Sequence, residues 1–391
     1  MVQQKSVKFI FPFVAYVGTV FGVGLYSLPY VMSRSGVWVF LLFMLIVSGL
    51  VFLVNFLFAD IVLRTPSKER FLGYVGQYVG KRAEKVFGWI TVVGFWGTFL
   101  AYLLVWGEFA YLAFGSVLPF SAIQFSLFFF VITAVIIIKG GRTIEWIDVV
   151  MLIGAAFLFG TLFVKGYAHV TEFIASPASF EGYILPYGSL MFAFWVAGII
   201  PEIVNQMRES PKKIIQLLVA GKALVAVLGF LFALFIVGIT GAETSREAFA
   251  GLESIVGRTS VLLGAIIGMI TITLAYNNLG WVSRNILMYD VKIKKIAATA
   301  SVVVPPLLLM LAGLVNFVLV ISIIGAIFLA SQGFMIFQLY RRSHTIKENT
   351  QPSLTKKPVP TWLLTTASIV FSLGILVEVS FVVYEFATGR L

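Results

Sequence analysis

Long uninterrupted apolar runs constrain this chain more than any other feature of its sequence. The stretch LLFMLIVSGLVFLVNFLF (41–58) is apolar on every face, whereas a strand of a membrane barrel would alternate apolar and polar residues. Apolar runs of 18 or more residues are typical of transmembrane helices. Hydrophobic residues make up 60% of the chain and charged residues only 12%, about half the charge that a soluble domain carries. The sequence therefore predicts an all-α integral membrane protein whose main partner is the lipid bilayer.

Eleven spans follow when each is given about 20 apolar residues. They cover approximately residues 8–32, 36–63, 86–115, 121–138, 144–164, 182–206, 213–240, 259–288, 296–315, 317–340 and 361–386.

The distribution of Lys and Arg predicts the orientation of these spans, because cytoplasmic loops carry the excess of both residues. With the amino terminus inside, 22 of the 28 basic residues fall in cytoplasmic segments, five fall outside, and Lys222 lies within a span. We therefore expect a multi-pass protein of the cell (plasma or inner) membrane with a cytoplasmic amino terminus and an extracellular carboxyl terminus. The net charge of +11 follows from this topology, and we expect no nucleic-acid partner.

Few residues are available for catalysis or metal binding. The chain has no cysteine, and its two histidines, His169 and His344, fall on opposite sides of the predicted membrane. A membrane enzyme needs a clustered acid, base or metal site, and a channel shows pore helices or rings of like charge. Neither pattern is present, so we expect no enzyme, no channel, no metal and no cofactor. We predict no protein partner.

Glycines interrupt the first span at mid-membrane depth. Gly18, Gly22 and Gly24 fall within seven residues, and each weakens a helix by about 1 kcal/mol. Unwound backbone in a bilayer is tolerated where it lines a protein cavity. The alternative is close helix packing, since Gly18 and Gly22 have the small-xxx-small spacing.

The sixth span repeats this pattern. It carries Pro186, a small-residue centre at Ala193, Ala197 and Gly198, and a second proline at Pro201. Paired interruptions indicate a binding site in transporters built from inverted repeats. We therefore expect a transporter core over 1–340, with repeats over about 8–164 and 182–340. A cytoplasmic linker (341–360) and an accessory eleventh helix with an extracellular tail (361–391) follow. Two outer segments, 165–182 and 241–258, are long enough to form a lid.

The interrupted backbone suits a zwitterion. Free N–H groups at a helix start attract a carboxylate, and free C=O groups at a helix end attract an ammonium group. An amino acid carries both.

Three segments resemble the amino acid/auxin permease family of the amino acid–polyamine–organocation superfamily. They are the first-span GTVFGVGLYSLPY (18–30), the sixth-span FAFWVAGIIPEIVNQMRESPKK (192–213) and RNILMYDVKIKK (284–295), which ends the eighth span. The resemblance covers essentially the whole chain, and the first-span glycines are its most specific motif. It implies the five-plus-five inverted-repeat fold, with discontinuous helices 1 and 6 and a substrate held between helices 1, 3, 6 and 8.

By position, the resemblance assigns the substrate site to the two interruptions and to aromatic side chains. The carboxylate is assigned to the first-span backbone, and the amino group to carbonyls near Val20 and at the sixth-span break. The side-chain pocket is assigned to the third, sixth and eighth spans and favours a hydrophobic or aromatic amino acid, although each aromatic residue has a packing or lipid-facing alternative. The full set is Gly18, Thr19, Val20, Gly22, Val23, Gly24, Tyr102, Trp106, Phe194, Trp195, Val196, Ala197 and Tyr276.

The sequence constrains the coupling ion least. A sodium site in this superfamily joins first-helix carbonyls to hydroxyl residues of the eighth helix. Here Ala275 and Tyr276 stand where the family often has Thr and Ser, which weakens a sodium assignment. Thr271 and Thr273 supply oxygens if the register shifts by one turn, so H⁺ is favoured and Na⁺ stays open.

Ionisable residues within the spans are the candidates for proton coupling, because such groups are costly in lipid. The deepest is Lys222, about nine residues, or roughly 14 Å, from the inner end of its span. It is suited to titrate or to replace a sodium ion, and the alternative is snorkelling towards the cytoplasm. The other candidates are Glu108, Glu202 and Asp148. Glu378 lies outside the repeats, and we expect it to be peripheral.

These patterns predict a secondary active amino-acid permease that works by alternating access, with proton symport favoured and sodium symport as the alternative. An amino-acid-sensing receptor subunit on the same fold is the alternative from a different functional class.

Overall fold

A computed structural model describes residues 2–20, 22–67, 69–139, 145–167, 170, 181–290, 293–345, 353–355 and 357–387. Within these residues every regular element is a helix. The α-helices are α1 (Val2–Val20), α2 (Val23–Ser35), α3 (Val37–Arg64), α4 (Phe71–Tyr78), α5 (Lys81–Phe114), α6 (Ala122–Lys139), α7 (Glu145–Gly166), α8 (Glu181–Phe194), α9 (Ile200–Met207), α10 (Pro211–Thr240), α11 (Glu253–Val256), α12 (Arg258–Asn285), α13 (Lys295–Leu311), α14 (Phe317–Ile323), α15 (Ala330–Thr345) and α16 (Thr361–Ala387). Short 3₁₀ turns are η2 (Ala197–Ile199) and η3 (Gly241–Glu243), and π-helical turns are η4 (Ile286–Asp290) and η5 (Ile324–Leu329).

Eight segments of the described residues are long and apolar enough to cross a membrane, and a ninth is the bent pair α1 and α2. Together with α7 and α13, they overlap all eleven predicted spans. A multi-pass membrane protein is therefore confirmed, and the count of eleven crossings stays a prediction.

Several helix ends differ from the predicted boundaries. Helix α13 ends at Leu311, four residues early, because Gly313 takes a left-handed conformation (φ +96°) that stops the helix. Helix α15 continues to Thr345, so the first five residues of the predicted linker belong to it. Helix α10 begins at Pro211, where a missing N–H costs nothing because the first turn has no acceptor for it.

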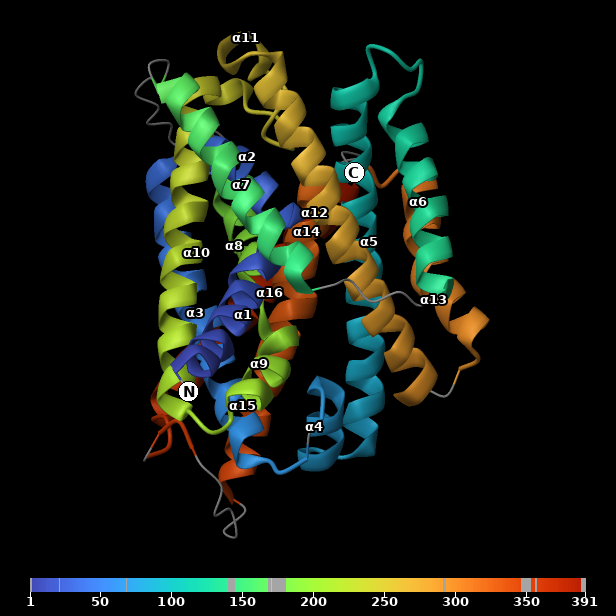
Figure 1. Ribbon diagram of the computed structural model, residues 1–391. Coiled ribbons are helices and arrows are strands. Elements are labelled where there is room, and N and C mark those ends of the chain that lie inside the picture. Colours follow the sequence, from blue (N-terminus) through green and yellow to red (C-terminus); the bar gives the residue numbers. More distant parts are fainter. Residues whose placement is uncertain are drawn as a thin grey trace.

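Helices α2 and α8 form the centre of the molecule and cross closely at one point. A Cβ atom placed on Gly24 would lie 2.6 Å from the Cα atom of Ala193, so only glycine permits this approach. Helix α10 packs along α1, α2 and α3, and α5 packs against α6, α12 and α13 on the other side (Figure 1).

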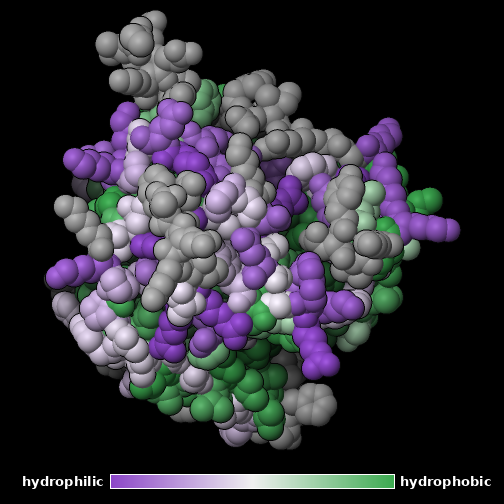
Figure 2. Space-filling model, turned by 90° about the horizontal axis from the view of Figure 1, so that it is seen from below, coloured by the Kyte–Doolittle hydropathy of each residue, from purple (hydrophilic) through white to green (hydrophobic). Residues whose placement is uncertain are grey.

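The segments predicted to be cytoplasmic gather at one end of the bundle. Helix α4, the first turn of α5 and the last turn of α15 all lie at the lower end in Figure 1. Seen from below, this end carries many hydrophilic side chains, with hydrophobic ones along its lower edge (Figure 2).

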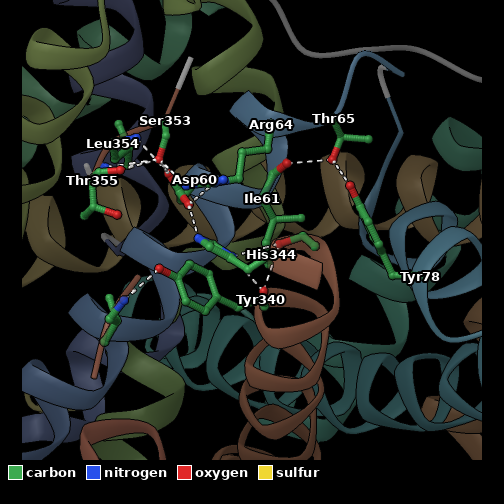
Figure 3. A network of polar contacts seen from close by, with 12 residues as sticks. Asp60, Ile61, Arg64, Thr65, Tyr78, Tyr340, His344, Ser353, Leu354 and Thr355 are labelled. Carbon is green, nitrogen blue, oxygen red and sulfur yellow. Dashed lines mark hydrogen bonds and ion pairs between the residues drawn. The ribbon is translucent and has the colours of Figure 1, made fainter. Parts of the chain in front are cut away.

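A polar clasp at this end ties the segment after α15 to α3 (Figure 3). The fully buried Asp60 pairs with Arg64 at 2.7 Å and accepts hydrogen bonds from the Ser353 hydroxyl and the Leu354 N–H, both at 2.7 Å. His344 of α15 lies 3.7 Å from the same carboxylate. We call these five residues the clasp. It joins α3 to the end of α15 and to the segment after it, almost 300 residues later in the sequence, and fixes the chain that leads into α16.

The α2–α8 crossing predicts a steric effect at Gly24. Gly24→Ala places a methyl group against the α8 backbone, and we expect it to lower stability by about 1–3 kcal/mol, as overpacking does. Gly49→Ala is the control, because a Cβ there meets no atom within 4 Å. Thermal unfolding in detergent, followed by tryptophan fluorescence, measures both. Equal melting temperatures for the two variants would contradict the close crossing.

The clasp predicts a strong effect of removing its central carboxylate. Asp60→Ala leaves Arg64, whose side chain is 16% exposed, without its counter-charge, and breaking such a buried pair costs about 3 kcal/mol. Glu253→Ala is the control, because its ion pair with Arg258 is half-exposed and 3.6 Å long, and exposed pairs contribute less than about 1 kcal/mol. The same unfolding measurement applies, and an Asp60→Ala protein as stable as the control would show that the clasp stabilises nothing.

Candidate functional site

The first span is interrupted between α1 and α2, where the glycines predicted it. Helix α1 ends at Val20, and α2 begins at Val23 in a direction 48° away. Gly22 is extended (φ −122°, ψ −164°), and its N–H donates to the Val20 carbonyl at 2.8 Å. Phe21 lies outside the described residues. The interruption thus leaves a helix end and a helix start beside each other.

The sixth span is interrupted at the matching place. Helix α8 ends at Phe194, Trp195 and Val196 are not helical, and the chain resumes through η2 into α9. Pro201 falls in the first turn of α9, where proline costs no hydrogen bond. Phe194, Val196 and Ala197 are buried, and Trp195 is half-buried.

The α2–α8 crossing brings the two interruptions together. Gly24 lies one residue after the start of α2, and Ala193 one residue before the end of α8. The amino end of α2 and the carboxyl end of α8 therefore meet. Unpaired N–H groups with a partial positive charge face unpaired C=O groups with a partial negative charge. This juxtaposition suits a ligand that carries both a carboxylate and an ammonium group.

Lys222 of α10 lies against the end of α8. Its ammonium group is 3.5 Å from the Phe194 carbonyl oxygen and 4.5 Å from the centre of the Phe194 ring, and the residue is 5% exposed. Of the described residues, no carboxylate pairs with it. The ammonium group therefore reaches the interrupted helix and does not extend to the cytoplasmic surface, as the snorkelling alternative required.

Aromatic side chains of α5 and α12 line the first interruption. The Tyr102 hydroxyl lies 4.0 Å from the place where a Cβ on Gly22 would be. Its ring is 6.3 Å from that of Tyr276, which is buried and also packs on Phe99 and Phe129.

Trp106 extends this aromatic wall towards the outer side. Its indole stacks on Phe129 at 4.5 Å, and its N–H donates to the Thr273 hydroxyl at 3.1 Å. The predicted side-chain residues Tyr102, Trp106 and Tyr276 are thus brought together, while Trp195 belongs to the other interruption.

The outer segment 241–258 covers this wall from above. Phe249 is fully buried, and its ring lies 5.8 Å from that of Tyr26 and 5.6 Å from that of Phe109. The second predicted lid segment, 165–182, lies mostly outside the described residues.

Space is open on the side of the interruptions that is predicted to be the inner side. A Cβ placed on Gly18 or Gly198 meets no atom within 4 Å. The Thr19 side chain is exposed, and so is Glu202 on α9. The interruptions are therefore covered by Phe249 on the side predicted to be outer and are exposed at Thr19 on the side predicted to be inner.

A family comparison settles which class of protein this site belongs to. Residues 5–289 match the model of the tryptophan/tyrosine permease family. The chain belongs to that family. Membership makes it a membrane transporter and not an enzyme, as the sequence predicted. The predicted resemblance to amino acid/auxin permeases is a separate assignment that this match does not name.

Solved transporters share the fold of this permease. The crystal structure of MhsT in complex with L-phenylalanine aligns with a TM-score of 0.62 at 14% identity, covering 94% of this chain and 97% of that one. The manganese transporter of Eremococcus coleocola, in complex with an aromatic bis-isothiourea substituted compound, aligns with a TM-score of 0.64 at 11% identity, covering 96% and 86%. No curated protein sequence matches.

The remaining ion candidates of the permease do not form a cluster. Glu108 is exposed on the outer half of α5, and Glu202 is exposed on α9. The Thr271 hydroxyl donates to Gly268 within its own helix, and the Thr273 hydroxyl donates to Met269 while accepting from Trp106. The side chain of Asp148 lies outside the described residues. Among the contacts of these candidates that the structure describes, that of Lys222 with Phe194 joins a candidate to an interruption.

Sequence reasoning missed Phe249, Phe99 and Phe129 in the aromatic wall. In a chain with 38 phenylalanines, one apolar ring looks like any other, and no spacing distinguishes these three. The segment 241–258 carried one usable signal, because Phe249 is its one aromatic residue.

The open inner side predicts cysteine accessibility, and the natural absence of cysteine makes single-cysteine variants clean probes. Thr19→Cys is expected to react with a water-soluble methanethiosulfonate at least about tenfold faster than Ser27→Cys, because only exposed thiols reach the reagent. Ser27 is the control, since it is fully buried in α2. Equal labelling rates in the purified permease would contradict inner access to the interruption.

Proposed function

We propose that this permease is a secondary active symporter of aromatic and other hydrophobic amino acids that works by alternating access, with H⁺ as the coupling ion. The observation that carries the proposal is the meeting of the α2 amino end with the α8 carboxyl end at the Gly24–Ala193 crossing. The family name and the L-phenylalanine complex of MhsT support the substrate class.

In this proposal, the two interruptions bind the two charges of the amino acid. The N–H groups around Thr19 to Gly24 receive the carboxylate, where the α2 dipole favours negative charge. Carbonyls near Val20 and from Phe194 to Ala197 receive the ammonium group. Tyr102, Trp106, Trp195 and Tyr276 contact the side chain. Rings prefer stacked or edge contacts with other rings, so this wall favours aromatic substrates.

In this proposal the ammonium group of Lys222 replaces a bound coupling ion, and the coupled proton binds to its amine. When Lys222 is protonated, its ammonium group binds the Phe194 carbonyl and adds positive charge near the α2 amino end, which receives the substrate carboxylate. The other carbonyls of the sixth-span break and those near Val20 then bind the substrate ammonium group. When Lys222 is neutral, both of its interactions are lost. Proton and substrate therefore favour each other's binding, which is the thermodynamic requirement for symport. No bound Na⁺ is needed, although a sodium site at Thr271 or Thr273 is the alternative that the test below addresses.

The proposal includes the predicted architecture. The core (1–340) comprises two inverted repeats of five spans, about 8–164 and 182–340, whose matching interruptions are α1–α2 and α8–α9. The linker (341–360) connects the core to the accessory helix in 361–391. The protein lies in the plasma or inner membrane, with its amino terminus cytoplasmic and its carboxyl terminus outside.

Uptake of radiolabelled amino acids into proteoliposomes tests the function. We expect accumulation of tryptophan, tyrosine or phenylalanine when the outside is acidic, and no accumulation of glutamate or lysine. Accumulation that requires a sodium gradient instead would replace H⁺ by Na⁺. Binding without accumulation under either gradient would identify an amino-acid sensor on the same fold and would refute transport.

The coupling role of Lys222 has its own test. Lys222→Met keeps an unbranched side chain one atom shorter but removes its charge, and we expect proton-driven accumulation to fall by about tenfold or more, because intramembrane charges carry the ion coupling. Exchange of internal for external substrate needs no net proton movement and should persist. Lys212→Met is the control, because Lys212 is exposed at the start of the same helix. Full proton-driven uptake by Lys222→Met would exclude Lys222 as the coupling group.

A further inference from the structure

A buried carboxylate lies in the accessory helix, away from the substrate site. Glu378 of α16 is 1% exposed, so the expectation that it is peripheral was wrong. It lies 17 residues from the start of α16, about 26 Å along the helix axis, and thus well within the bundle. Neither of its carboxylate oxygens has a hydrogen-bond partner.

Two hydroxyl groups from other helices share this position. Ser322 of α14 and Tyr187 of α8 are the neighbours that interact with the Glu378 carboxyl group. Both hydroxyls are buried, and neither has a hydrogen-bond partner in the structure. Three helices therefore bring four buried polar oxygens to one place, and none of the four makes a hydrogen bond of normal length and angle.

Glycines bring these helices close enough to form the cluster. Gly374 lies one turn before Glu378, and a Cβ there would collide with the Tyr187 ring. Gly188 would collide with Ser322 in the same way. Helix α14 also changes to the π-helical turn η5 two residues after Ser322, at Ile324, and such turns often mark functional sites.

No described charge compensates Glu378. Tyr187 is the titratable side chain that α8 presents to it, while Tyr183 is exposed. Helix α14 and the turn η5 contain no ionisable residue, and those of α15 lie at its far end, from Tyr340 to His344. An isolated carboxylate in this environment is too costly to persist and takes up a proton or a cation.

We infer that Glu378, Ser322 and Tyr187 form a buried proton-binding site that joins the accessory helix α16 to α8. In its protonated form the carboxyl group has one O–H donor and a carbonyl acceptor. The carboxyl O–H donates to one of the two hydroxyl oxygens, and the carboxyl C=O accepts a hydrogen bond from the other hydroxyl. One bound proton therefore gives every member of the cluster a hydrogen-bond partner. Loss of the proton leaves a buried charge and loosens the contact of α16 with α8.

The site is placed to act on the substrate-binding helix. Tyr187 lies seven residues, or about 10 Å, before the end of α8 at Phe194. The protonation state of Glu378 therefore affects the packing of α8, the helix whose carboxyl end contacts Lys222. The inference rests on the buried cluster alone and holds whether or not Lys222 couples transport.

Infrared spectroscopy of the purified permease tests the site without substrate or gradient. At neutral pH we expect a carbonyl stretching band of a protonated carboxylic acid that shifts in D₂O and is absent from Glu378→Gln. Ser322→Ala should move this band, because it removes one hydrogen-bonding partner of the acid. Glu108→Gln is the control and should leave the band unchanged, since Glu108 is exposed.

Two results would overturn the inference. One is a neutral-pH spectrum in which the acid band is absent or is equally present in Glu378→Gln. The other is a band that appears only when sodium is removed, which would make the cluster a sodium site. If Glu378→Gln does not fold, Glu378→Asp replaces it, and the band should then shift in frequency without being lost.

Discussion

The structure depends on the rule that backbone N–H and C=O groups within a bilayer need partners. Helices meet this rule internally, and an interrupted helix breaks it unless something else supplies the partners. Here two interruptions lie at one crossing, and the amino end of one helix faces the carboxyl end of the other. The partial positive charge at the amino end of α2 lies beside the partial negative charge at the carboxyl end of α8. Each end therefore lowers the free energy that burial of the other costs. Lys222 supplies a further donor to the Phe194 carbonyl. A polar binding site can therefore persist within an apolar bundle.

The rest of the fold serves to hold this crossing. Helix α10 packs along α1, α2 and α3, and the aromatic residues of α5 close the opposite side. Glycine at position 24 sets how closely the helices approach, since any side chain there meets the α8 backbone. Aromatic rings of α5 and α12 line the interruption on one side, while Thr19 is exposed on the other.

Much of this arrangement was readable from the sequence, because membranes impose simple rules. Apolar runs located the helices, and glycines and prolines located the interruptions at Val20–Val23 and Phe194–Ala197. Other features depend on tertiary packing and have no local signal. The crossing partner of Gly24, the placement of Phe249 over the site and the burial of Glu378 all require knowledge of which helix faces meet. Lys222 was recognised by its depth, but its partner at Phe194 was not. Helix α13 was drawn too long because a left-handed glycine, not a polar residue, ends it.

The clasp has a consequence for the order in which the protein is assembled. Asp60 is among the early residues to leave the ribosome, whereas Ser353 and Leu354, which complete its hydrogen bonds, emerge almost 300 residues later. Domains fold as they are synthesised. The Asp60 carboxylate near the end of α3 therefore lacks part of its hydrogen bonds until nearly the whole chain is present. Closure of the clasp thus requires the segment that leads into the last helix, and a chain that ends before residue 353 lacks two of the donors to Asp60.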